Sequence, residues 1–264
     1  MSPAPAGAAG PAPAIAVRGL SKVFAGRGTH VRALDNVSAD IGAREFVSVL
    51  GPSGCGKSTL MRIIAGLIPY ERGEVLVTGG PVTGPRPEIG VVFQTANLLP
   101  WLTVVGNLRL GAELRKLPRD VIGGKVDPML KLLGLEGFER AYPHELSGGM
   151  QQRVALGQAL MLNPSILLMD EPFGALDALT RDRMNLELLR MWEAQRQTVF
   201  FVTHSIAEAI FLSDRILVMT ARPGRILQEI PVDLPRPRDP KATRGSREFG
   251  EYVVRLSELM GVFG

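Results

Sequence analysis

A glycine-rich stretch constrains the fold of this chain more than any other feature of its sequence. Residues 51–58 match the pattern G-x-x-x-x-G-K-[ST] in full, after an expected strand at 45–50 and before an expected helix at 58–67. The glycines let successive backbone N–H groups converge on a phosphate, and the helix directs its positive end at the same anion. The alternative, a chance glycine-rich turn, does not explain the flanking strand and helix. The sequence therefore predicts an α/β fold with a phosphate-binding loop.

The residues of this loop have separate expected roles. Lys57 can reach the β- and γ-phosphates of a nucleoside triphosphate, and Ser58 can offer its hydroxyl to Mg²⁺ with Thr59 beside it. The predicted nucleotide-binding residues are Gly51, Pro52, Ser53, Gly54, Cys55, Gly56, Lys57, Ser58 and Thr59. The loop alone predicts a nucleotide and does not separate kinases, GTPases and motors.

Two carboxylates follow a later apolar run. Residues 165–169 predict a buried strand of a parallel sheet, and Asp170 and Glu171 stand at its carboxyl end, where open α/β sheets bind ligands. Asp170 is expected to hold Mg²⁺ and Glu171 to accept a proton from the attacking water. A solvated helix cap is the alternative for the pair alone. His204 follows another expected buried strand, at 198–203, where it could contact the γ-phosphate; a structural histidine is its alternative.

Composition limits where such a chain can work. Its 264 residues suffice for one large domain, or for a domain with a subdomain, and 45% of them are hydrophobic. A net charge of +4 is too weak to imply nucleic acid, and the single cysteine, Cys55, excludes a disulfide within the chain. No apolar run reaches the ~18 residues that span a bilayer, and no secretion signal is evident. We therefore expect a soluble, cytosolic protein, which a partner would have to hold in place if it works at a membrane.

The pattern of residue types changes along the chain. Residues 1–14 are almost all Ala, Pro and Gly and predict a disordered tail. Residues 15–234 predict the α/β domain, with a helical subdomain at about 95–146. Residues 235–264 predict a basic extension and a helix at 247–260; the basic stretch is expected to be a solvated tail, with contact to acidic lipid heads as the alternative. Further strands are expected at 15–17, 75–78, 89–93, 216–220 and 225–230, and further helices at 148–162, 180–196 and 206–212.

The stretch Leu-Ser-Gly-Gly-Met-Gln-Gln-Arg at 146–153 resembles the signature motif of ABC ATPases. A serine hydroxyl and two glycine amides at a helix start form a second anion cradle, and one nucleotide does not need two cradles from one chain. The resemblance implies a head-to-tail homodimer, in which ATP lies between the phosphate loop of one chain and Ser147, Gly148 and Gly149 of the other. A plain helix cap is the alternative for this motif in isolation.

Other positions agree with this resemblance, which extends from about residue 14 to about residue 260. Gln94 resembles the Q-loop glutamine, which senses Mg²⁺ and water, and His204 resembles the switch histidine. Phe24 stands where the family has an adenine-stacking aromatic, with a core phenylalanine as the alternative. Asp177 resembles the D-loop aspartate at the dimer contact, although Gly174 replaces a frequent serine. The resemblance implies an ABC ATPase cassette, with a P-loop NTPase core, a helical subdomain and an N-terminal antiparallel β region.

The resemblance also implies the cofactors and the catalytic set. ATP and Mg²⁺ are the expected cofactors, and ATP hydrolysis is the expected reaction. The expected catalytic residues are Lys57, Gln94, Glu171 and His204, and the expected metal ligands are Ser58, Gln94 and Asp170. One departure is that Gly157 and Gln158 stand where the family commonly has Ala and Arg. A glycine inside a helix costs about 1 kcal/mol against Ala, so we expect reduced stability or altered dimer coupling.

Two segments narrow the subfamily. Residues 97–107 and 219–226 resemble the nitrate/sulfonate/taurine group of bacterial importers. This resemblance implies an ATPase subunit at the cytoplasmic face of the bacterial membrane, a separate permease and, indirectly, a periplasmic or extracellular solute-binding protein. The cargo stays open among nitrate, sulfonates, taurine and compounds like thiamine precursors. Trp101 is expected either to anchor a short helix of the permease or to pack inside the helical subdomain.

Two other functions remain as alternatives. A soluble ABC ATPase acting on DNA or the ribosome usually carries two cassettes or a long coiled-coil insertion, whereas this chain has one cassette and a short insertion. No nucleic-acid partner is therefore expected. A non-hydrolysing regulatory nucleotide binder would not need Glu171 and His204.

Overall fold

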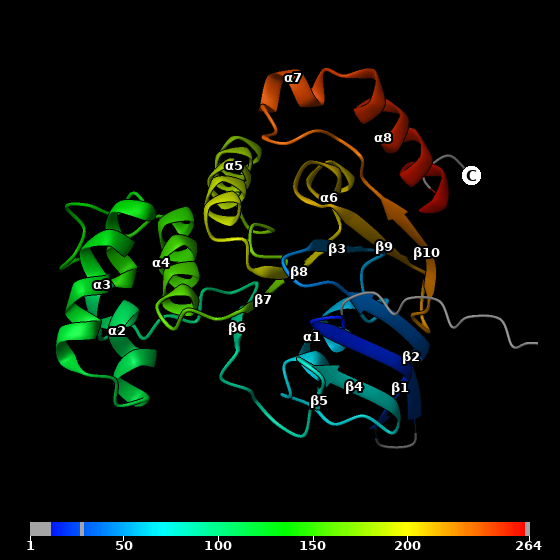
Figure 1. Cartoon of the computed structure of the whole chain (residues 1–264), viewed down its shortest axis with the longest axis horizontal. Coiled ribbons are helices and arrows are strands. Elements are labelled where there is room, and N and C mark those ends of the chain that lie inside the picture. The colour runs from blue at the N-terminus through cyan, green and yellow to red at the C-terminus, as the bar shows by residue number, and fades with distance from the viewer. Residues whose placement is uncertain (1–11, 27–28, 262–264) are drawn as a thin grey trace, which may run out of the picture.

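The computed structural model describes residues 12–26 and 29–261, which contain two β-sheets and a separate group of helices (Figure 1). The strands are β1 (Ile15–Gly26), β2 (Thr29–Ile41), β3 (Phe46–Leu50), β4 (Arg72–Val77), β5 (Gly80–Pro81), β6 (Ile89–Val92), β7 (Ile166–Asp170), β8 (Thr198–Thr203), β9 (Arg215–Met219) and β10 (Ile226–Pro231). The helices are α1 (Lys57–Ile64), α2 (Val104–Leu114), α3 (Arg119–Leu132), α4 (Gly148–Leu160), α5 (Ala178–Gln195), α6 (Ile206–Leu212), α7 (Pro240–Arg244) and α8 (Arg247–Leu259), with a 3-10 turn at η1 (Pro143–Glu145).

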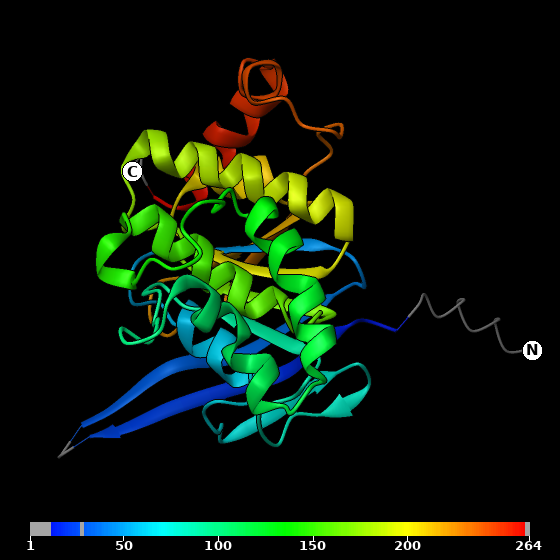
Figure 2. The same cartoon turned by 90° about the vertical axis from the view of Figure 1, so that its left-hand side faces the viewer.

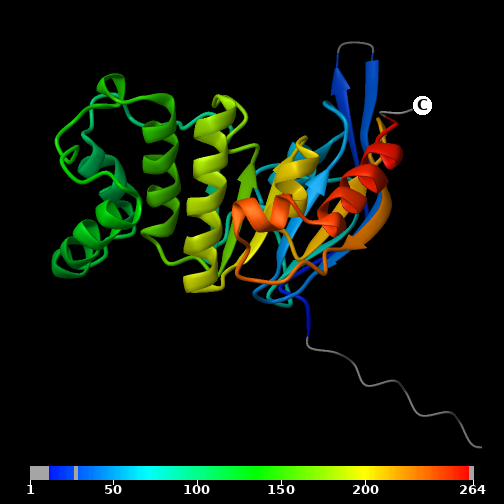
Figure 3. The same ribbon diagram turned by 90° about the horizontal axis from the view of Figure 1, so that it is seen from above.

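The central sheet has six strands in the order β10-β9-β3-β8-β7-β6, parallel except for β10 at one edge. Strands β3, β7 and β8 are buried along their whole length because apolar side chains cover both faces of the sheet. Helices α5, α6 and α8 lie over one face, and α1 lies on the other (Figures 1 and 3). The expected hairpin around residues 222–224 is confirmed as β9 and β10.

The antiparallel sheet has the order β2-β1-β4-β5 and covers the far side of α1. The expected strand at 15–17 is too short, because β1 runs for 12 residues and pairs with the 13 residues of β2 in a long hairpin (Figure 2). Much of the expected tail at 1–14 lies outside the described residues. Ala14 is packed, however, and its carbonyl accepts a hydrogen bond from the N–H of Thr78 at 2.8 Å.

Helices α2, α3 and α4 form a separate group beside the β6 edge of the central sheet (Figure 1). Their apolar faces join the large core that also contains α5 and α6. Helix α4 begins just after the expected boundary at 146 and packs against α2, so it completes this helical group. None of the helices in the described part of the chain is long and apolar enough to cross a membrane.

Gly157 is required by the packing of α4 rather than being a weak point of that helix. A Cβ at this position would lie 2.4 Å from Cδ1 of Leu133 and 2.7 Å from Cδ2 of Leu108. The absence of a side chain therefore lets α4 approach both neighbouring helices closely. This packing argues against the expected loss of stability, because a close approach of helices offsets the cost of a helical glycine. Altered dimer coupling stays a prediction.

Alanine substitutions should show this difference between buried and exposed helical glycines. Gly157→Ala is expected to lower the free energy of unfolding by about 1–2 kcal/mol, because overpacking costs more than alanine's helix propensity returns. Gly123→Ala in α3 is the control, since it is exposed with no atom within 4 Å of its added Cβ, and it should raise stability by roughly 0.5–1 kcal/mol. Urea denaturation measures both, and a Gly157→Ala chain as stable as the Gly123→Ala chain would contradict the packing argument.

The basic stretch after residue 235 is not the solvated tail that its charge predicted. Arg238 is only 4% exposed, and its guanidinium donates to the carbonyls of Ile210 at 3.1 Å and Phe211 at 2.9 Å, at the C-terminal end of α6. Burial lowers the pKa of Arg238 to about 10. The guanidinium therefore satisfies carbonyls that the end of a helix leaves without partners. Its positive charge also interacts favourably with the negative end of the helix dipole.

Two further arginines hold this C-terminal segment against the core. Arg236 is bonded to Asp214, with 2.9 Å between Nη2 and Oδ1. Arg244 forms two hydrogen bonds of 2.8 Å with the carboxylate of Asp182 on α5. Residues 235–247 thus connect α5, α6 and α8, and their charges serve internal contacts.

Candidate active site at the phosphate loop

The predicted phosphate loop connects β3 to α1 and lies at the carboxyl edge of the central sheet. Gly56 has φ of +111° and a Cβ there would lie 2.8 Å from the Ala33 carbonyl oxygen, so only glycine fits this turn. The Nζ of Lys57 donates to the carbonyls of Gly51 at 2.7 Å and Pro52 at 3.0 Å. The lysine is thereby held across its own loop, which places its ammonium group beside the expected phosphate position.

Ser58 and Asp170 are brought together from positions 112 residues apart. The Ser58 hydroxyl donates to Oδ1 of Asp170 at 2.7 Å, and Asp170 is only 4% exposed. Burial raises the pKa of Asp170, against the opposing effect of the Ser58 hydrogen bond. A hydroxyl beside a buried carboxylate is a donor set that fits Mg²⁺, because the ion prefers oxygen ligands and would offset the cost of burying this charge.

Glu171 and His204 form the second pair of the site. Nδ1 of His204 lies 3.0 Å from Oε2 of Glu171, which brings together residues from the ends of β7 and β8. Glu171 adopts a positive φ of 44°, an unfavourable conformation for a glutamate, while its N–H donates to the Val202 carbonyl at 2.9 Å. The backbone therefore anchors Glu171 at the end of β7, and its carboxylate contacts His204.

A cleft of about 390 Å³ lies over the phosphate loop. It is lined by Phe24, Val31, Ala33, Ser53, Gly54, Gly56, Lys57, Ser58, Thr59, Gln94, Glu171 and Arg222. Phe24 is 43% exposed, on the far part of β1, and does not belong to the core. The ring is held near Lys22, whose Nζ lies 5.1 Å from its centroid and is paired with Glu71 at 2.7 Å.

The remaining residues of the motif belong to the same loop but do not line the cleft. Gly51 and Pro52 supply the carbonyls that hold Lys57, and Cys55 is buried beneath the loop. Gln94 lines the cleft, and the Phe93 carbonyl before it accepts a hydrogen bond of 3.1 Å from Nε2 of Gln152 on α4. Gln152, which sequence reasoning missed, therefore connects the helical group to Gln94.

Ser147, Gly148 and Gly149, the signature residues, are not among the described residues that line this cleft. Ser147 caps α4 by accepting a hydrogen bond of 3.3 Å from the Met150 N–H, and Gly148 and Gly149 open that helix. A Cβ on Gly149 would lie 3.0 Å from Thr180, so this helix start lies beside that of α5, which Asp177 caps at 3.1 Å from the Thr180 N–H. These signature residues thus lie apart from the residues that line the cleft.

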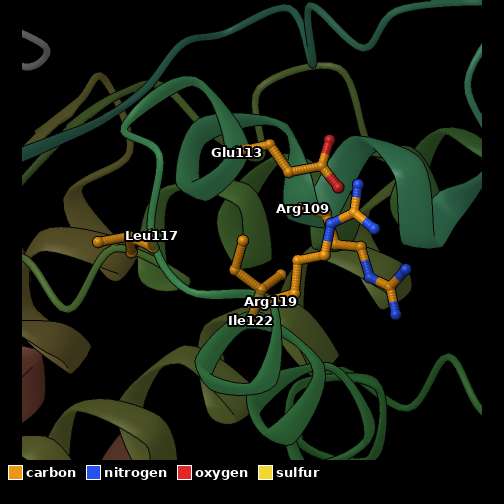
Figure 4. Close-up of a pocket in the computed structure, with 5 residues that line it drawn as sticks. All are labelled: Arg109, Glu113, Leu117, Arg119 and Ile122. Carbon is orange, nitrogen blue, oxygen red and sulfur yellow. The ribbon is translucent and has the colours of Figure 1, made fainter.

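A further pocket, of about 470 Å³, lies on the helical group between α2 and α3 (Figure 4). Its lining residues are Arg109, Glu113, Leu117, Arg119 and Ile122. The charged side chains gather on one side of the opening, and none of the predicted site residues lines it.

The geometry over the phosphate loop suits phosphoryl transfer to water. The loop amides and Lys57 can hold phosphates, Ser58 and Asp170 can hold Mg²⁺, and Glu171 can accept a proton from water that His204 helps to orient. Bound Mg²⁺ would neutralise charge that develops on the phosphate oxygens.

The chain matches the family described as ABC transporter over residues 34–174. It is 50% identical to an uncharacterized ABC transporter ATP-binding protein of Methanocaldococcus jannaschii, over 92% of this chain and 90% of that protein. It is 47% identical to the taurine import ATP-binding protein TauB of Rhizobium johnstonii, over 91% and 94% of the two chains. It is 43% identical to the aliphatic sulfonates import ATP-binding protein SsuB of Bacillus cereus, over 94% and 97%.

Solved structures agree with this likeness. A dimeric ATP-binding cassette bound to ADP and Pi, in a post-hydrolysis state, is 33% identical and superposes with a TM-score of 0.73, over 83% of this chain and 98% of that one. The cbiO1 protein of Clostridium perfringens, part of the cbiONQ transporter complex, is 27% identical with a TM-score of 0.75, over 96% and 99%. The chain therefore belongs to the ABC transporter family, as an ATP-binding subunit that couples ATP hydrolysis to transport.

Proposed function

We propose that this subunit energises the uptake of a small anionic solute of the nitrate, sulfonate or taurine class through a separate permease. The observation that carries the proposal is the likeness to TauB and SsuB, at 47% and 43% identity, over 91% and 94% of this chain. The segments 97–107 and 219–226 support the same group. In this proposal, the subunit works at the cytoplasmic face of a bacterial membrane, and a solute-binding protein delivers the solute to the permease.

The proposed nucleotide site is the cleft over the phosphate loop. Lys57 and the loop amides would hold the triphosphate of ATP, and Phe24 would stack on the adenine. Ser58, Asp170 and Gln94 would hold Mg²⁺, supported by the hydrogen bond between the first two. Glu171 would act as the base, with His204 bonded to it beside the γ-phosphate.

The proposed active form is a head-to-tail homodimer. Ser147, Gly148 and Gly149 lie away from the cleft of their own chain, which supports their use by a second copy. Asp177 would lie at the contact between the two chains. Closure of the dimer around two ATP molecules would switch the access of the permease, and hydrolysis would reset it.

Trp101 is the proposed contact with the permease. It is 69% exposed, which favours a binding surface over a place in the core. The loop that carries it is fixed by the buried amide of Asn107, which accepts from the Leu99 N–H at 2.8 Å and donates to the Leu102 carbonyl at 3.0 Å. This loop also follows Gln94, so the same segment joins the nucleotide cleft to the proposed permease surface. We also propose the domain boundaries expected from the sequence, which are a tail at 1–14, the ATPase domain at 15–234 with its helical subdomain at about 95–146, and a C-terminal extension at 235–264.

Uptake assays test the proposed function. A strain lacking the gene should lose uptake of at least one of labelled taurine, an aliphatic sulfonate or nitrate, and the wild-type gene should restore it. Lys57→Ala is expected to restore none of it, because the site loses the cation that faces the phosphates. Normal uptake of all three solutes in the deletion strain would overturn the proposed class of solute.

Trp101→Ala separates the permease contact from nucleotide binding in the same assay. A hot-spot aromatic contributes about 2 kcal/mol or more to an interface, so the variant should pull down at least about tenfold less permease from membranes. Its ATP affinity should match wild type. Leu227→Ala, at an exposed apolar residue on β10, is the matched control and should leave permease binding unchanged.

A further inference from the structure

We infer that Arg222 is a positioning residue of the nucleotide site, which holds the phosphate loop at Gly54 and so raises the affinity for ATP. The inference rests on the proposed nucleotide site. No motif in the sequence assigns a role to Arg222, which lies 168 residues from Gly54 in the chain.

The contact between Arg222 and the phosphate loop is specific. Nε and Nη2 of the guanidinium donate to the Gly54 carbonyl at 3.1 Å and 2.9 Å. Gly54 has φ of +73°, and a Cβ there would lie 3.3 Å from Nη2, so the arginine lies directly against a turn that favours glycine. Hydrogen bonds from a charged donor are stronger than neutral ones, and two of them converge here on one oxygen.

The backbone beside Arg222 is wedged against the same loop. A Cβ on Gly224 would lie 2.2 Å from the Cys55 carbonyl oxygen, which leaves no room for any side chain. The Gly224 N–H donates to the Ala33 carbonyl at 2.9 Å, and its carbonyl accepts from the Asp35 N–H at 3.0 Å. The turn between β9 and β10 is thus fixed to both β2 and the phosphate loop, and it delivers the guanidinium to Gly54.

The charge of Arg222 also suits the ligand. Lys57 and Arg222 are the two cationic side chains among the described residues that line the cleft, and Glu171 is the anionic one. ATP is a polyanion, so a second cationic side chain beside Lys57 favours its binding. Arg222 brings this positive charge to the cleft while its guanidinium holds the Gly54 carbonyl. By holding the phosphate loop, Arg222 would stabilise bound ATP equally before and during hydrolysis. Its loss should therefore lower the affinity for ATP more than the rate of turnover.

Calorimetric titration of the full-length chain with Mg-ATP tests the inference. Arg222→Ala should raise the Kd about tenfold, as expected for losing charge-assisted hydrogen bonds, and Arg222→Lys should restore part of the affinity. Arg225→Ala is the matched control, because Arg225 lies in the same turn but pairs with Asp35 outside the cleft. Its Kd should stay within about twofold of wild type. In the assembled transporter, Arg222→Ala should raise the KM for ATP with kcat within about twofold.

The Kd values of these variants decide whether Arg222 positions the phosphate loop. A wild-type Kd for Arg222→Ala, or an equal loss in Arg225→Ala, would overturn the inference, and thermal unfolding without nucleotide reports whether each variant folds. If Arg222→Ala does not fold, Arg222→Lys decides: a Kd between the wild type and tenfold above it supports the inference, and a wild-type Kd overturns it. Lys57→Ala tests the site itself. Unchanged ATP binding in that variant refutes the proposed nucleotide site, whereas its loss alongside an unchanged Arg222→Ala refutes only the role of Arg222.

Discussion

Glu171→Gln is expected to lower ATP turnover by about 10²–10⁴-fold while ATP still binds. Glutamine keeps the size of the side chain and an oxygen within reach of His204, which lies 3.0 Å from Oε2 in the native chain. The amide cannot accept a proton from water at neutral pH, so hydrolysis stops after the nucleotide has bound. An ATP-bound dimer should therefore accumulate, and size-exclusion chromatography with ATP and Mg²⁺ measures it.

A second carboxylate variant distinguishes loss of the catalytic base from a general effect of losing one negative charge. Asp182→Asn is a matched control, because it also neutralises one carboxylate, paired with Arg244 away from the cleft. It should leave turnover within about twofold of wild type, because this ion pair touches none of the residues that line the cleft. Turnover close to wild type in Glu171→Gln would remove Glu171 from the role of base.

A mixture of two inactive chains should recover activity if each site is shared between subunits. Lys57→Ala disables the phosphate loop, and Ser147→Asp puts a negative charge opposite the triphosphate while keeping a residue that caps α4 well. In a head-to-tail heterodimer, the intact loop of the Ser147→Asp chain meets the intact signature of the Lys57→Ala chain. Each heterodimer therefore contains one complete site out of two. Because about half of the randomly formed dimers are heterodimers, the mixture should show roughly a quarter of the wild-type rate if the sites act independently.

The assay compares the transporter assembled with each variant alone and with both coexpressed. Each single variant should lose nearly all phosphate release, because both of its sites contain the same defect. Activity in the coexpressed sample no greater than that of the single variants would mean that loop and signature serve one nucleotide within a single chain. That result would contradict the proposed sandwich, whereas recovery would support a site shared between two chains, in agreement with Ser147 lying outside its own cleft.

The strands of the central sheet were predictable because strands that are buried on both faces consist mainly of apolar residues. β3, β7 and β8 lie inside a parallel sheet and show continuous apolar runs. β1 and β2 were largely missed, because part of their surface faces solvent and carries polar side chains. Irregularities in their register, between Val17 and Leu20 and again before Val23, also break the two-residue alternation that identifies a strand.

Charge in the C-terminal segment was misinterpreted for a related reason. A sequence shows that Arg238 is charged but not that backbone carbonyls at the end of α6 are available to it. The effect of Gly157 on stability was likewise predicted from its helix propensity alone, although a side chain at this position would meet Leu108 and Leu133. In both cases a local property is a poor guide, because packing partners from distant segments outweigh it.

The sequence by itself determined which residues can carry the chemistry of the phosphate loop. A short motif specifies the turn of Gly51 to Ser58, and strand ends place Asp170 and Glu171 beside it, because parallel strands end at one edge of a sheet. Only the tertiary structure decided that Arg222 holds Gly54 and that Gln152 on α4 is bonded to the backbone beside Gln94. These relations join segments far apart in the chain, and they depend on how loops meet after the sheet and helices have packed.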